Sequence, residues 1–126
     1  MKGTTMISND NKPFRLSADQ IQPLAEGYGA CFATDMITVD GARVGFLYRE
    51  EPDNEYDSGW RFLSGTESQE YLDDDRNTSI FDVNTIANYA PEIIPFLDAP
   101  IGSAFEREEG VDEFEEIELI PDDEDE

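Results

Sequence analysis

Two apolar stretches, residues 31–39 and 42–48, flank an Asp40-Gly41 pair. Both stretches are rich in the β-branched and aromatic residues that are common in strands. An Asp-Gly pair readily adopts the positive φ angles that a two-residue turn between antiparallel strands requires. The pattern therefore predicts a β-hairpin over residues 31–48.

The second strand of this predicted hairpin alternates between two faces. Val44, Phe46 and Tyr48 fall on one face, whereas Leu47 and Arg49 fall on the other.

Three shorter apolar stretches, each bounded by turn-forming residues, predict further strands at 60–63, 79–83 and 103–106. The segment 114–120 mixes acidic and apolar residues. We expect a charged edge strand there, with a partly helical extension as the alternative.

Helical signals are short. Ser17 and Gln20 have the spacing of a capping box, but Pro23 limits that helix to a turn or two. Asn84 is a candidate cap for a helix through residue 89, and Pro91 suits the first turn of another that ends near residue 98. Together with the strands, these signals predict an α+β fold, a mostly antiparallel sheet with short helices packed on one face.

The chain has 126 residues, which is the size of one domain. We expect a flexible N-terminus at 1–13, a folded domain at 14–107, and an acidic extension with a disordered tail at 108–126. The tail prediction rests on the unbroken acidic run after Pro121, which has no apolar residue to offset the entropy lost on ordering.

The charge balance excludes several classes of function. With 31 acidic residues, 8 basic residues and no histidine, the net charge is −23. Such a chain is repelled by nucleic-acid backbones and by anionic membranes, so neither is an expected partner. It also lacks the commonest general base and metal ligand. The lone cysteine, Cys31, and a polar N-terminus without a signal-peptide pattern indicate a reduced, cytoplasmic protein.

No motif points to catalysis or to a cofactor. Asp73, Asp75 and Asn77 have the spacing that opens a calcium-binding loop, but Thr78 and Asn84 stand where its glycine and final glutamate belong. We therefore expect no metal site, no cofactor and no catalytic residues. Paired carboxylates of the kind that hydrolases use are uninformative among so many acids.

The segment that follows the predicted hairpin looks like a partner-binding surface. It is strongly acidic and leads into the only tryptophan of the chain, a residue type enriched at interface hot spots. The alternative for this tryptophan is a place in the core. The candidate partner-binding residues are Glu50, Glu51, Asp53, Glu55, Tyr56, Asp57 and Trp60.

Several blocks of the sequence resemble the immunity protein 33 domain family, long classed as a domain of unknown function. The resemblance covers roughly residues 14–107 in order. The blocks are ITVDG and VGFLYREEP (37–41 and 44–52), DSGWRFLSG (57–65), EYLD (70–73) and, the strongest, NTIANY through LDAPIGSAFER (84–107).

The resemblance implies a bacterial immunity-type protein that binds and neutralises a cognate toxin without catalysis. The acidity of the chain favours a basic toxin, because opposite charges accelerate association and favour the correct partner. Two alternatives remain at this stage. One is a regulator that mimics DNA with its carboxylates, and the other is a small carboxylate-based hydrolase.

Overall fold

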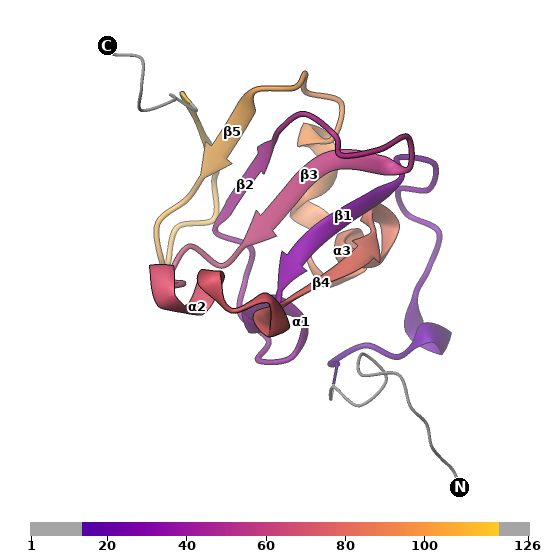
Figure 1. Cartoon of the computed structure of the whole chain (residues 1–126), viewed down its shortest axis with the longest axis horizontal. Helices are drawn as coiled ribbons and strands as arrows, with labels where there is room; N and C mark the ends of the chain where they lie inside the picture. Colours follow the sequence, from indigo (N-terminus) through magenta and orange to yellow (C-terminus); the bar gives the residue numbers. More distant parts are fainter. Residues whose placement is uncertain (1–13, 119–126) are drawn as a thin grey trace, which may run out of the picture.

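One mixed sheet organises residues 14–118, the part of the chain that the computed structural model describes (Figure 1). Its strands lie in the order β4-β1-β3-β2-β5-β6. Only β1 and β3 are parallel, and every other neighbouring pair is antiparallel. The predicted α+β class with a mostly antiparallel sheet is therefore confirmed. The strands are β1 (Ala30–Thr34), β2 (Phe46–Arg49), β3 (Asp57–Leu63), β4 (Thr78–Asp82), β5 (Ser103–Glu106) and β6 (Glu115–Glu118).

The helical segments are short and lie behind the sheet or at its ends (Figure 1). Helix α3 and the 3-10 helix η4 lie behind the sheet, whereas α1 and α2 lie at the lower end in that view. The residue that caps α3 is Asp82 rather than the expected Asn84, because the Asp82 carboxylate accepts the Asn84 N–H. The segments are η2 (Ala18–Gln20), α1 (Asp35–Thr38), α2 (Gln69–Asp73), η3 (Asp75–Asn77), α3 (Val83–Tyr89) and η4 (Pro91–Phe96).

The hairpin predicted over 31–48 is wrong. Strand β1 ends at Thr34, the chain winds into α1, and β1 and β2 each pair with β3 rather than with one another. Gly41 does have a positive φ of +83°, but it follows α1 instead of joining two strands. Glycine is favoured after a helix for the same reason as in a tight turn, so the local signal fits either structure.

The core lies between the sheet and the helical segments α3 and η4, on one face of the sheet. Trp60 and Phe62 of β3 point into it with their rings stacked at 6.0 Å, and both are fully buried. The Trp60 indole N–H donates to the Leu97 carbonyl at 3.2 Å. Asn84 of α3 accepts the N–H groups of Leu24 and Ala25, which fastens the segment before β1 to this layer.

Strand β3 carries a bulge at Gly59. Ala30 of β1 is aligned with Asp57 of β3, and Phe32 is aligned with Arg61. The same step along the sheet therefore takes two residues in β1 but four in β3. Gly59 sits within this step with a φ of +92°. The bulge shortens the path along β3 relative to a regular strand, and the side chains of Asp57 and Arg61 meet in an ion pair at 2.9 Å.

Strand β6 confirms the charged edge strand expected within 114–120, since it pairs with β5 in antiparallel register. The early part of the predicted acidic extension is thus built into the sheet. The expected flexible N-terminus at 1–13 and the tail after Pro121 lie outside the described residues. No helix among residues 14–118 is long and apolar enough to cross a membrane.

Replacing Gly59 with alanine should destabilise the protein by more than about 2 kcal/mol, because a side chain meets two penalties there. The φ is unfavourable for alanine, and the added Cβ would lie 2.3 Å from the Glu50 carbonyl oxygen. Gly102 is the matched control, since its φ is +99° but its Cβ would meet nothing within 4 Å. Gly102→Ala should cost only about 1–2 kcal/mol. Urea unfolding measures both, and equal losses would contradict the role of the close approach.

Candidate functional site

Among residues 14–118, no helix lies across the face of the sheet opposite α3 and η4, although α2 borders it at one end (Figure 1). Its strand registers align one row of outward-pointing residues across all six strands. This row combines aliphatic and aromatic side chains with a single charged one. In order from β4 to β6 it consists of Ile80, Phe32, Arg61, Tyr48, Ala104 and Ile117.

Three hollows lie along this face and adjoin one another. The first, of about 190 Å³, lies between β1, β4 and the loop before β3, and the second, of about 290 Å³, lies over the centre of the sheet. The third, of about 1030 Å³, lies between α2, β2 and β5. Phe32 lines the first two, and Leu63 and Leu72 line the last two. We call the three together the sheet groove.

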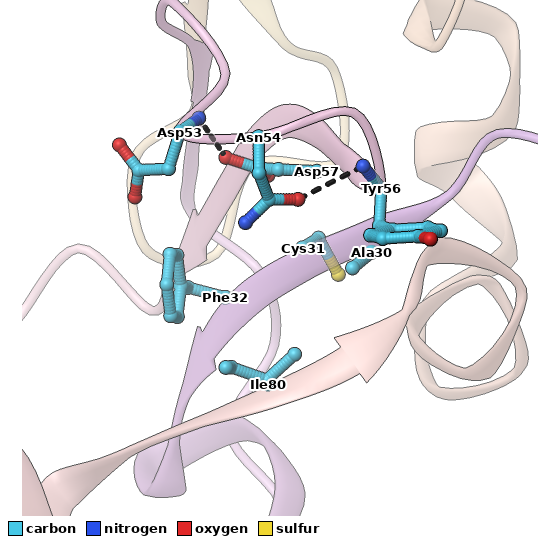
Figure 2. A pocket seen from close by; sticks show the side chains of 8 residues that line it. All are labelled: Ala30, Cys31, Phe32, Asp53, Asn54, Tyr56, Asp57 and Ile80. Carbon is cyan, nitrogen blue, oxygen red and sulfur yellow. Dashed lines mark hydrogen bonds between the residues drawn. The ribbon is translucent and has the colours of Figure 1, made fainter.

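Figure 2 shows the first hollow from close by. Phe32 and Ile80 form one side, and the Tyr56 ring forms the other, with Asn54 between them. Tyr56 is 73% exposed and Ile80 is 62% exposed, so this lining is open to solvent.

Arg61 forms the polar centre of the groove. Its guanidinium makes two hydrogen bonds with the Asp57 carboxylate, at 3.0 and 2.9 Å, and one with Glu50 at 2.6 Å. The same group stacks over the Phe32 ring at 4.4 Å. The side chains of Arg61 and Asp57 are only 6% and 7% exposed, so this is a buried ion pair.

The ion pair shifts the pKa values of both partners. Burial alone would lower the pKa of Arg61, but hydrogen bonds to Asp57 and Glu50 outweigh burial and raise it. Hydrogen bonding by Arg61 holds the pKa of Asp57 far below its usual range, against the opposing effect of burial. Both groups therefore stay charged at neutral pH.

Asp57 also holds the acidic loop, which we define as residues 50–56. Its carboxylate accepts the N–H groups of Asp53 and Gly59, both at 2.9 Å. The Tyr56 carbonyl accepts the Ala30 N–H at 2.8 Å, and the Asn54 side chain accepts the Tyr56 N–H at 2.8 Å. The loop is thus tied to the sheet at both of its ends.

The seven candidate partner-binding residues fall into three groups. Glu50, Asp53, Tyr56 and Asp57 line the groove, whereas Glu51 and Glu55 are exposed on the acidic loop but line none of the hollows. Trp60 is fully buried on the opposite face, so its alternative assignment to the core is confirmed and it offers no exposed contact. The buried ion pair of Asp57 likewise marks that residue as structural.

Phe32, Ile80 and Leu72 line the groove but were not predicted from the sequence. A signal was present in β2, where Leu47 is buried in the core and Phe46 and Tyr48 lie on the groove face with rings 5.3 Å apart, as predicted. The prediction was wrong for Val44, which precedes β2 and is buried in the core with Leu47. No local pattern could show which strands would flank β2, and hence which side chains would extend this aromatic surface.

Neither the acidic segment 73–77 nor Cys31 forms a metal-binding or reactive centre within the part of the chain that the structure describes. Asp74 pairs with Arg76 at 2.9 Å, and no group of three or more metal-ligating side chains is found within residues 14–118. Cys31 is buried, as expected from the sequence, and burial raises the pKa of its thiol well above the usual range.

Removing the Asp57 carboxylate should be severely destabilising. Asp57→Ala leaves Arg61 charged and buried without its main partner, a loss of about 3–5 kcal/mol. Adding Arg61→Leu should recover part of this loss, because no unpaired charge then remains. Denaturant unfolding of the two single variants and the double variant measures the coupling, and strictly additive losses would argue against a buried pair.

The low pKa of Asp57 also predicts a pH dependence. A carboxyl group whose pKa is lowered by folding stabilises the protein above its unfolded pKa of about 3.9, and this contribution fades as the pH falls. The difference in unfolding free energy between wild type and Asp57→Asn should therefore shrink below about pH 4. Urea titrations across this range measure it, and a constant difference would contradict the assignment. Comparing the two proteins cancels the repulsion among the other carboxylates.

Residues 31–118 match the family described as the immunity protein Imm33 domain. The match begins at the second residue of β1 and ends with β6, so it contains all of the sheet except Ala30, together with the acidic loop. No curated protein and no solved structure gave a significant match. Because the matched region spans well over half of the chain, the protein belongs to the Imm33 family of immunity protein domains.

Proposed function

We propose that this protein is a non-catalytic immunity protein that neutralises a toxin by binding to it directly. Membership of the Imm33 family supports an immunity function. The observation that carries the binding proposal is the acidic loop, which presents exposed carboxylates on a backbone tied to the sheet. A surface of this kind can recognise a partner without any reactive group.

The charge of the chain supports a basic toxin as the partner. A net charge of −23 attracts a positively charged protein over a long range and speeds its encounter. Exposed acids then favour the correct orientation of the two proteins. We also propose a cytoplasmic location, to which a single, buried cysteine is suited.

The fixed geometry of the acidic loop makes it better suited to recognition than a mobile acidic segment. Glu51 and Glu55 lie between the two ends that the sheet holds, at Glu50 and Tyr56. Charges that are already positioned lose less conformational entropy on binding, so more of their attraction appears as affinity.

Co-expression with the toxin encoded by a neighbouring reading frame is the direct test of function. We expect the protein to restore growth of cells that express this toxin, and the two purified proteins to form a stable complex. Protection of cells without any complex would contradict direct binding. Restoration of growth by an enzymatic change to the toxin, visible as a mass difference, would contradict the non-catalytic proposal.

Reversing the charges of Glu51 and Glu55 together to lysine should weaken the complex by more than tenfold, or about 1.4 kcal/mol. Most of the loss at low salt should appear as slower association. Glu51 and Glu55 are chosen rather than Asp57, because reversing the charge of Asp57 would break its buried ion pair with Arg61 and destabilise the fold.

The matched control is the double reversal of Asp19 and Asp75, which changes the net charge equally. Both side chains are exposed and line none of the hollows of the groove. Surface plasmon resonance measures both variants over a range of salt concentrations. Equal weakening by the two double variants would show that only total charge matters, and would reject the acidic loop as the contact surface.

A further inference from the structure

The sheet groove is a large, partly apolar surface that α3 and η4 do not cover. Ile80 and Tyr56 are mostly exposed, and the rings of Phe32, Phe46 and Tyr48 are only partly buried. Folded monomers rarely leave contiguous apolar surface of this kind open unless a partner binds there. A contact surface that includes this groove would be larger than the acidic loop alone.

The charges around the groove indicate the nature of that partner. Its three hollows are lined by seven carboxylates and three guanidinium groups. Each of the three arginines is already ion-paired: Arg61 with Asp57 and Glu50, Arg43 with Asp112, and Arg107 with Glu92. The excess charge is therefore negative, and a complementary occupant must carry positive charge.

The same excess disfavours a second copy of the chain and its acidic C-terminal run as occupants. A second copy of this chain carries a net charge of −23 and would bring more negative charge to an acidic groove. The acidic run after Pro121 has the same sign. Like charges brought together at an interface are strongly unfavourable, so a basic partner fits best.

The aromatic lining suits lysine and arginine side chains in particular. Such a side chain lays its aliphatic stem or its cationic head on an aromatic ring and reaches a carboxylate with its charge. Arg61 and Arg107 make this contact within the protein's own structure. The guanidinium of Arg61 lies 4.4 Å from the Phe32 ring centre, and that of Arg107 lies 4.3 Å from the Phe114 ring centre.

We propose that the sheet groove is the docking site for a basic segment of the partner protein. Lysine or arginine side chains of that segment lie against Phe46, Tyr48 and Tyr56, and their charges face Glu50, Asp53 and Glu106. The proposal rests on the proposed function and deepens it, because it names the surface and the chemistry that bind the toxin. The acidic loop forms one border of this site.

A short capped peptide of alternating lysine and valine serves as the probe, with its glutamate–valine counterpart as the negative control. Nuclear magnetic resonance of the full-length protein in physiological salt maps where each peptide binds. We expect shifts concentrated in β1, β2 and β4 for the basic peptide and none for the acidic peptide. Shifts confined to the helix-covered face or to residues 119–126 would overturn the proposal.

Ile80→Lys places a positive charge in the groove and should weaken binding of the basic peptide about tenfold, or about 1.4 kcal/mol. Ile101→Lys is the matched control, because Ile101 is 48% exposed but lines none of the hollows. It should change the affinity by less than about twofold, since a distant charge is screened at physiological salt. Equal weakening by the two variants would overturn the proposal.

A second variant keeps the groove testable if Ile80→Lys fails to fold. Glu106→Gln keeps the side-chain shape while removing a carboxylate of the groove, and should weaken the peptide about two- to fivefold. Glu113→Gln is its control, since Glu113 is exposed and lines none of the hollows. Unchanged affinity in Glu106→Gln, with a folded protein, would count against the proposal.

Other occupants give different results. A dimer in ultracentrifugation that Ile80→Lys dissociates would identify a second copy as the occupant, and tighter peptide binding after deletion of residues 1–13 would identify that segment. Either result would overturn the proposal. If the wild-type protein neutralises its toxin and Ile80→Lys does so equally well, the groove is rejected while the immunity function stands.

Discussion

The buried ion pair between Arg61 and Asp57 is the interaction on which the functional surface depends. Burying two charges is costly, and the cost is met only because each partner makes several hydrogen bonds. The pair in turn requires the bulge at Gly59, which shortens the distance between two residues of one strand. Glycine is needed there because its φ is positive and the Glu50 carbonyl leaves no room for a side chain.

From this pair the structure extends to both sides of the sheet. The bulged strand sends Trp60 and Phe62 into the core, where α3 and η4 cover them, and sends Arg61 to the open face. Arg61 and Asp57 then position the aromatic side chain of Phe32, the carboxylate of Glu50 and the backbone of the acidic loop. One strand therefore couples the stability of the core to the geometry of the candidate binding surface. A substitution that breaks the Arg61–Asp57 pair would change the stability of the core and the geometry of the surface together. Substitutions that test binding should therefore be made at exposed residues.

Local patterns predicted the individual elements well where each pattern had a single structural meaning. Strand β5 occupies 103–106 as expected, β3 and β4 contain or overlap their predicted stretches, and Gln20 accepts the Ser17 N–H in the predicted capping box. The hairpin failed because Asp40-Gly41 is compatible with the end of a helix as well as with a tight turn. A tight turn was preferred because the residues on both sides of the pair are apolar and were expected in strands. Two of them, Ile37 and Thr38, are instead buried within α1.

The sequence by itself determined the fold class, the net charge of −23 and the resemblance to an immunity family that the match over residues 31–118 now establishes. These properties follow from composition and from short-range patterns, which any segment carries on its own. Only the tertiary structure decided that β1 lies beside β3 and β4, that Asp57 is buried rather than offered to a partner, and that six strands align one row of side chains into a groove. Those outcomes depend on which distant segments pair, and pairing is selected by the burial of the whole sheet rather than by any one stretch of the chain.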